Sequence, residues 1–147
     1  MLSPVVRIVD DDASVCESQS FFLQLAGFRT RSFSSAEAFL KDDDPQAPGC
    51  IILDVRMGGM TGIELQQELN RRGSDLPIIF LSAHGDIEMA MSCVGAGAFN
   101  FLVKPPEPEK LQSLVTKAVE KNRMERRQKA HALNLKRLFD TLTTAEK

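Results

Sequence analysis

Five short runs of apolar residues, rich in β-branched side chains, recur along the first 103 residues of the chain. Their first residues are separated by 21 to 27 positions, which is enough for one helix and two turns each time. Three of the runs show no alternation with polar residues, as is typical of strands covered on both faces in a parallel sheet. We therefore expect five strands, at residues 5–9, 28–33, 50–53, 77–81 and 98–103.

The segments between these runs carry the signals of helix ends. Asp12 is a helix cap for a segment that runs towards Ala26, and Gly27 follows as a stop signal. Residues 34–37 and 61–64 each match the capping box, in which a hydroxyl and a glutamate three positions later satisfy the first backbone amides. Five strand–helix units with right-handed connections predict an α/β fold with a doubly wound parallel sheet.

Ligands of such a sheet bind beyond the carboxyl ends of the strands, and four predicted strands end in chemically useful side chains. The first ends in the three aspartates 10–12, the third in Asp54, the fourth in Ser82 and the fifth in Lys104. Carboxylates held close together raise one another's pKa unless a cation neutralises them, and Mg²⁺ or Mn²⁺ suits a site of oxygen ligands. Lys104 and Ser82 would then donate to a transferring phosphoryl group, while Asp54 keeps a free oxygen to act as a nucleophile.

Four short motifs together resemble the receiver domain of bacterial response regulators, over roughly residues 4–120. These motifs are Ile8–Asp12, Leu53–Met57, Leu81–Ala83 and Lys104–Pro105. In addition, residues 35–40 and 82–86 look like the branch that regulates nitrogen fixation and aromatic-compound catabolism, whose members are usually fused to a LuxR-type helix-turn-helix domain. The resemblance implies the flavodoxin-like strand order 2-1-3-4-5.

The resemblance implies a role for each residue of the acidic site. Asp54 would be the phosphoacceptor, which receives a phosphoryl group from a histidine of a sensor kinase. Asp11 would bind Mg²⁺ directly and Asp10 mainly through water, with Asp54 and the backbone carbonyl of Arg56 as further ligands. Lys104 would pair with the phosphoryl group.

Further residues would respond to the phosphoryl group or tune its lifetime, again by resemblance. Ser82 would move in to hydrogen-bond it, and Phe101 stands where the family has an aromatic residue that turns inward with this movement; the alternative is that Phe101 is an ordinary core residue. Arg56 and His84 match lifetime-tuning positions, although His84 also fits a plain loop histidine. The peptide bond before Pro105 is expected to be cis.

Two positions depart from the pattern of the branch. Gly58 stands where proline is usual, and with Gly59 it predicts a looser loop after the phosphoacceptor. Pro106 stands where phenylalanine is usual after Lys-Pro, which removes an aromatic anchor at the start of the last helix. Neither change touches the phosphorylation chemistry.

The composition narrows the class of protein. With 147 residues, 43% of them hydrophobic and 26% charged, the chain has room for one domain and a short appendage. Its apolar runs are far shorter than the ~20 residues that cross a bilayer, so no membrane association is expected. Its three cysteines, Cys16, Cys50 and Cys93, lack the spacing of a disulfide framework or a zinc site, which suits the reducing cytoplasm.

The charge of the chain is uneven. Residues 1–116 carry 9 basic and 16 acidic side chains, a net charge of −7, whereas residues 117–147 carry 9 and 4, a net charge of +5. The chain is therefore an acidic body with a basic extension. The acidic run 42–44 is expected to be a solvated loop and not a second metal site.

The basic extension has the pattern of a helix. Residues 117–142 contain neither glycine nor proline, and heptads counted from Leu111 lose their apolar seam at 121, 125 and 128 and regain it at 132, 135, 139 and 142. We expect a receiver domain over residues 1–120, followed over residues 121–147 by a helical linker and the start of a missing output domain. The linker would pair with a second copy, or else remain an exposed, fraying helix.

Together these patterns indicate a phosphorylation-controlled switch, not an enzyme with an external substrate, since it would accelerate only its own phosphorylation and dephosphorylation. Its partners would be a sensor histidine kinase and a second copy, bound through the face of the fourth helix, fifth strand and fifth helix or through the linker; DNA would be bound only through the missing output domain. A stand-alone adaptor receiver is the alternative. An aspartyl-phosphate hydrolase would need an acid where Arg56 stands, and a flavin- or nucleotide-binding domain would need an anion cradle after the first strand.

Overall fold

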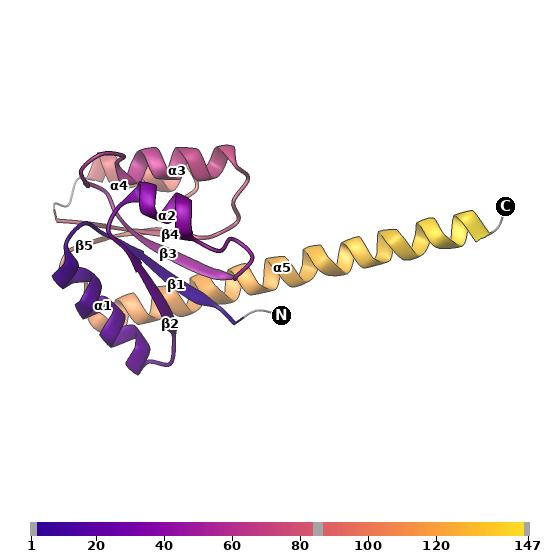
Figure 1. Ribbon diagram of the computed structural model, residues 1–147, viewed down its shortest axis with the longest axis horizontal. Helices are drawn as coiled ribbons and strands as arrows, with labels where there is room; N and C mark the ends of the chain where they lie inside the picture. The colour runs from indigo at the N-terminus through magenta and orange to yellow at the C-terminus, as the bar shows by residue number, and fades with distance from the viewer. Residues whose placement is uncertain (1–2, 84–86, 146–147) are drawn as a thin grey trace.

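The computed structural model describes residues 3–83 and 87–145, which form one parallel sheet with helices on both sides (Figure 1). The sheet has five strands in the order β2-β1-β3-β4-β5, so the predicted fold class and strand order are confirmed. The strands are β1 (Val5–Val9), β2 (Arg29–Phe33), β3 (Gly49–Asp54), β4 (Ile78–Ser82) and β5 (Asn100–Val103). The helices are α1 (Ala13–Leu25), α2 (Ala36–Asp42), α3 (Gly62–Arg71), α4 (Ile87–Gly95) and α5 (Pro108–Ala145).

The sheet divides the apolar core into two layers. Helices α1 and α5 cover one face, and α2, α3 and α4 cover the other (Figure 1). Because successive strand residues point to opposite faces, Ile8 and Ile52 pack on the side of α1 and α5, while Val9 and Leu53 pack on the opposite side. All four side chains are at most 1% exposed. Burial on both faces explains why these strands read as unbroken apolar runs in the sequence.

Most of the predicted helix ends are present. Asp12 caps α1 by accepting hydrogen bonds from two backbone amides of its first turn, and Gly27 follows the helix with a φ of 95°, a conformation that favours glycine. Thr61 and Glu64 form the expected capping box of α3. The box predicted at residues 34–37 is wrong, because the cap of α2 is Ser35, which accepts from the amide of Ala38.

An arginine is completely buried in β1, which has a strand on each side. The guanidinium of Arg7 is 2.8 Å from the carboxylate of Asp43 and donates to the backbone carbonyls of Val5, Asp44, Ala47 and Pro48. Every contact except that with Val5 lies in the loop between α2 and β3. The acidic run 42–44 is therefore not simply a solvated loop, since Asp43 neutralises a buried charge that needs a partner.

Helix α5 packs on the sheet and then continues beyond the domain (Figure 1). Its 38 residues make it about 57 Å long. The buried face of this part of the helix packs on the sheet and does not follow the seam predicted at 114 and 121; its members are Leu111, Val115, Ala118, Val119 and Asn122. Contacts with the body thus extend beyond residue 120, and the domain boundary there stays a prediction.

Two polar residues of α5 anchor it to loops at the amino ends of the strands. Asn122, with no exposed surface, accepts from the amide of Gly49 at 2.9 Å and donates to the carbonyl of Asp75. One turn later, Arg126 contacts both carboxylate oxygens of Asp75, at 3.0 and 2.9 Å, and the carbonyls of residues 45 and 46. These contacts fix the direction in which the rest of α5 leaves the domain.

The anchor between Asp75 and Arg126 should depend on pH. Burial works to raise the pKa of Asp75, but the hydrogen bonds and charge of Arg126 outweigh it and lower the pKa below its ordinary value of 3.8. A lowered folded-state pKa adds stability above the unfolded-state value, and this stability is lost as the pH falls through the folded-state value. We expect Asp75→Asn to be about 1 kcal/mol less stable than the native chain at pH 7, with the difference shrinking below pH 4 in urea titrations. A constant difference at pH 7 and pH 3 would contradict this account.

No helix among residues 3–83 and 87–145 has the length and apolar character to cross a membrane.

Cys16, Cys50 and Cys93 are free thiols within the core, and burial raises the pKa of Cys50 to about 12. They therefore act as small apolar packing residues.

Candidate functional site

Three aspartates meet where β1 and β3 end. Because β1 and β3 are neighbours in the sheet, with Val9 opposite Leu53, their following residues Asp10 and Asp54 lie side by side. One carboxylate oxygen from each of Asp10, Asp11 and Asp54 lies within 4.8 Å of the others. Asp10 and Asp54 are only 3% and 7% exposed, whereas Asp11 faces solvent. The sequence-predicted acids are thus brought together in one small, half-buried cluster.

Lys104 reaches this cluster from the end of β5. Its Nζ donates to Oδ2 of Asp10 at 2.7 Å and lies 3.4 Å from Oδ1 of Asp54. Burial works to lower the pKa of Lys104, but the two carboxylates outweigh it and raise the pKa overall, so the side chain is an ammonium. Burial and the neighbouring Asp10 raise the pKa of Asp54, against the opposing effect of Lys104. The carboxylates of Asp10 and Asp54 thus still repel each other, although the ammonium of Lys104 contacts both.

The backbone around the acids holds them in place. The amide of Asp12 donates to Oδ1 of Asp10 at 2.9 Å, and the amide of Gly58 lies 3.4 Å from Oδ2 of Asp11. Gly62 starts α3 directly against the backbone of Asp54, where a Cβ atom would collide with the carbonyl oxygen. These contacts make the loop after β3 part of the site.

Glu37 is a site-supporting residue that the sequence did not reveal. Its carboxylate accepts from the amide of Met60 at 2.7 Å and so ties α2 to the loop between β3 and α3. Gly59, with a φ of 74°, brings the loop so close that a Cβ atom there would lie 2.9 Å from this carboxylate. The glutamate was expected in a local capping box, and local spacing alone gave no sign of a partner 23 positions away.

The other predicted residues lie on β4 and β5, on the β3 side of the acids. Ser82 is the last residue of β4 and is 3% exposed, and its carbonyl accepts from the amide of Lys104 at 2.7 Å. Phe101, on β5, is half-buried, with its ring centroid 6.4 Å from that of Phe80. The peptide bond between Lys104 and Pro105 is cis. His84 lies outside the described residues.

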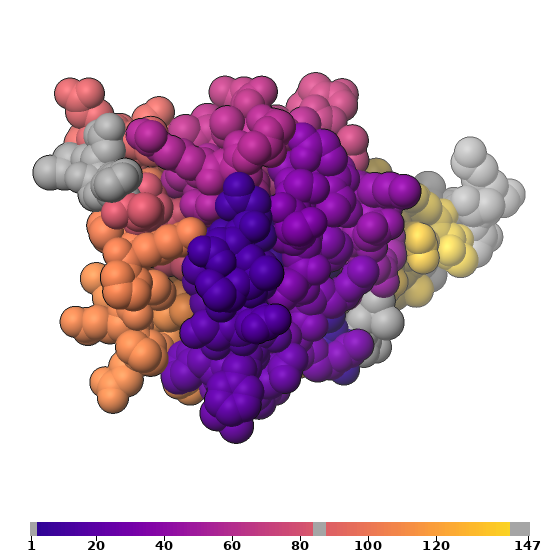
Figure 2. All heavy atoms as spheres, turned by 60° about the vertical axis from the view of Figure 1, so that its left-hand side comes forward, coloured from indigo at the N-terminus to yellow at the C-terminus, as the bar shows by residue number. Residues whose placement is uncertain are grey.

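The donor set fits a divalent cation. Three carboxylates carry more negative charge than one ammonium neutralises, and burial together with the charge of Asp10 raises the pKa of Asp54. A site of carboxylate oxygens that is open on one side suits Mg²⁺, which keeps several of its waters. Figure 2 shows this end of the molecule, where the start of α1 (indigo) lies beside the segment after β5 (orange).

Fold and site together define a flavodoxin-like α/β domain with an acidic, cation-competent site at the carboxyl edge of its sheet. Residues 6–116 match the response regulator receiver domain. The chain therefore belongs to the family of response regulator receivers from two-component systems, and the resemblance noted in the sequence is confirmed.

The relatives of the chain are longer than the chain itself. Response regulator protein TmoT of Ectopseudomonas mendocina is 40% identical over 142 residues, which are 97% of this chain and 64% of TmoT. Transcriptional regulatory protein TdiR of Thauera aromatica is 46% identical over 118 residues, 80% of this chain and 52% of TdiR. The chain thus spans between about half and two thirds of the length of these relatives.

Solved structures of response regulators are also similar to this chain. The response regulator StyR superimposes with a TM-score of 0.89 at 40% sequence identity, over 94% of this chain and 70% of StyR. A structure named FixJ-N superimposes with a TM-score of 0.73 at 36% identity, over 82% of this chain and 96% of that one. The similarity to StyR covers much of α5 as well as the sheet.

Proposed function

We propose that Asp54 accepts a phosphoryl group from a phosphohistidine of a sensor kinase. The observation that carries this proposal is the contact of one ammonium, Lys104, with both Asp10 and Asp54 beside a third carboxylate. An oxygen of Asp54 would attack phosphorus as the bond from phosphorus to the histidine nitrogen breaks, and the electron pair of that bond returns to the imidazole. The site would work in the cytoplasm, on a chain that transfers the group to itself.

Each neighbouring residue has a task in this transfer. Asp10, Asp11, Asp54 and the carbonyl of Arg56 would hold Mg²⁺, which when bound neutralises phosphate oxygens that carboxylates alone would repel. Lys104 would pair with the phosphoryl group as negative charge develops on it. Ser82, at the end of the adjacent strand, would donate its hydroxyl to the phosphoryl group once Asp54 is modified.

The output would be a change of the α4–β5–α5 face. Ser82 ends β4, and Phe101 lies on the adjacent strand β5, which belongs to this face, so movement of Ser82 would be followed by movement of Phe101. The changed face, or the exposed apolar residues Leu135 and Phe139 of α5, would pair two copies. Because relatives such as TdiR are named transcriptional regulatory proteins and are longer than this chain, we propose a DNA-binding domain after α5 as the target of the switch.

Self-phosphorylation by a small donor tests the proposal and the role of Lys104. With acetyl phosphate and Mg²⁺, the native chain should gain the mass of one phosphoryl group, and EDTA should prevent the gain. We expect Lys104→Met to slow labelling about a hundredfold, because it removes a donor to the developing charge. Lys110→Met, an exposed lysine at the start of α5, should label at the native rate in the same intact-mass assay. Equal rates in both variants would remove Lys104 from the mechanism.

Metal binding should appear as stability. Since a cation bound only to the folded state stabilises it by mass action, Mg²⁺ at one hundred times its Kd should add about 2.7 kcal/mol to the free energy of unfolding. Asp11→Asn, at an exposed position, should fold normally but gain much less at the same Mg²⁺ concentration. Asp42→Asn, an exposed acid away from the cluster, is the control and should respond as the native chain does. A Mg²⁺ response unchanged by Asp11→Asn would place the cation elsewhere.

A further inference from the structure

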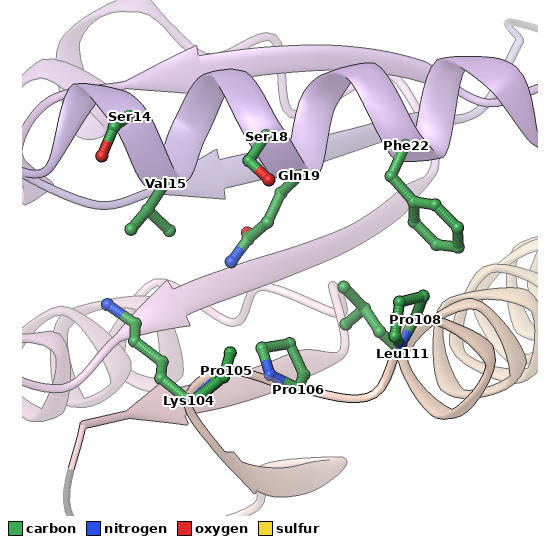
Figure 3. Close-up of a pocket in the computed structure, with 10 residues that line it drawn as sticks. All are labelled: Ser14, Val15, Ser18, Gln19, Phe22, Lys104, Pro105, Pro106, Pro108 and Leu111. Carbon is green, nitrogen blue, oxygen red and sulfur yellow. The ribbon is translucent and has the colours of Figure 1, made fainter.

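A second hollow lies on the α1–α5 side of the sheet. It is a groove of about 360 Å³ between α1 and the segment that joins β5 to α5 (Figure 3). Its walls are mainly apolar, and Ser14, Ser18 and Gln19 add polar groups from α1; the apolar lining residues are Val15, Phe22, Pro105, Pro106, Pro108 and Leu111. The stem of Lys104 lines one end, while its Nζ is turned towards the aspartates. The groove is hence a separate site that shares one side chain with the proposed phosphorylation site.

The groove contains a buried polar group. Gln19 projects from α1 towards Pro105 and Pro106 (Figure 3) and is only 8% exposed. Its Oε1 is buried and has no hydrogen-bond partner among residues 3–83 and 87–145. A buried acceptor without a donor is destabilising, and such groups are rare in folded proteins. In Figure 3 the nitrogen of the Gln19 amide points towards Pro105 and the oxygen lies behind it; rotation about the last side-chain bond, which is soft in glutamine, exchanges the two and turns the oxygen towards the groove.

We propose that this groove binds a small, uncharged aromatic molecule that donates a hydrogen bond to Gln19. The volume lies at the lower end of the range for small-molecule sites, about 300–1,000 Å³, and exceeds the roughly 150 Å³ in which an engineered cavity holds benzene. Mainly apolar walls with a few polar groups are the usual composition of such a site, in which the polar groups set the orientation of the ligand; here Gln19 is the buried one, beside the hydroxyls of Ser14 and Ser18. A ring with a hydroxyl or ring N–H matches both the walls and the acceptor.

The ring should enter with its donor towards α1. Phe22 and Leu111 lie at one end of the groove and Lys104 at the other, with Gln19 between them (Figure 3). Pro106 forms part of the wall opposite Gln19, so a larger side chain at this position would occupy the space of the ring. Phenylalanine is the natural choice for such a change, because the sequence pattern of the branch leads one to expect it there.

Titration with phenol, followed by two-dimensional NMR of the methyl and amide groups, tests the proposal. Phenol should shift signals of Val15 and Leu111 saturably in the native chain, and anisole, which has the same ring but no donor, should bind at least about fivefold more weakly. Gln19→Leu should weaken phenol about fivefold and leave anisole unchanged, and Pro106→Phe should abolish binding of both. Gln112→Leu, an exposed glutamine on α5, is the matched control and should bind phenol as the native chain does.

Three outcomes would overturn the proposal. The first is an absence of saturable shifts at the groove in the native chain. The second is unchanged phenol binding in Pro106→Phe, a test that remains available should Gln19→Leu not fold. The third is a set of groove shifts that follow protein concentration instead of phenol, which would mean that a second copy occupies the groove. Since the titration needs neither Mg²⁺ nor a phosphoryl donor, its result is independent of the proposed phosphorylation.

Discussion

Asp54→Asn should reduce labelling by acetyl phosphate to background. The amide has nearly the shape of the carboxylate but lacks the charged oxygen that attacks phosphorus. Burial and Asp10 raise the pKa of Asp54, so its ionised form destabilises the folded state at neutral pH. The substitution removes this charge and should therefore raise the free energy of unfolding in metal-free buffer. Intact-mass measurement and urea titration of the same sample would show loss of chemistry in a chain that is folded.

The matched control for this substitution is Asp12→Asn. Asp12 is the neighbouring acid in the sequence, but it faces solvent and caps α1, and asparagine is an equally good cap. It should therefore label at the native rate and keep native stability. Labelling of Asp54→Asn that matches the native chain would falsify the assignment of the phosphoacceptor.

Arg7→Met should be the most destabilising single substitution discussed for this chain. Methionine fills much of the same volume but leaves the carboxylate of Asp43 without its partner and removes one donor from each of four backbone carbonyls, of which those of Asp44 and Pro48 keep a backbone amide donor. Breaking a buried ion pair by removing one partner costs about 3–5 kcal/mol, which should appear as a lowered midpoint in urea denaturation.

An exposed arginine on the neighbouring strand provides the control. Arg29 lies at the start of β2 on the surface, so Arg29→Met should change stability by no more than about 0.5 kcal/mol. The double variant Arg7→Met with Asp43→Asn should recover part of the loss, because it removes the unpaired charge. If Arg7→Met were as stable as Arg29→Met, the loop between α2 and β3 would have to relax around the missing guanidinium, and the expected loss of stability would be wrong.

The sequence predicted the acidic site because the rule behind it is topological. Residues that follow parallel strands must gather at one edge of the sheet, so Asp10, Asp54, Ser82 and Lys104 could be placed together without any knowledge of side-chain positions. The resemblance to receivers then assigned their chemistry. The fold could be predicted from the unbroken apolar runs that recur along the chain, because a sheet covered on both faces requires its strands to be apolar on both sides.

The residues that the sequence did not reveal are those with partners fixed by tertiary structure. Arg7 is a charged residue within an apolar run, and its acceptors stand up to 41 positions away in a loop. Glu37 has the spacing of a local cap but bonds to another loop. Asn122 lies one position beyond the seam predicted at 121, and its buried partners, the amide of Gly49 and the carbonyl of Asp75, are 73 and 47 positions away.

The continuity of α5 has a mechanical consequence. Beyond Arg126 the helix runs for 19 further residues to Ala145, about 28 Å of stiff rod. A tilt of about 10° at its anchorage would swing the far tip by about 5 Å, by the geometry of such a rod. The rod thus acts as a lever arm, which turns a small change of angle at the sheet into a displacement of several ångströms at its far end.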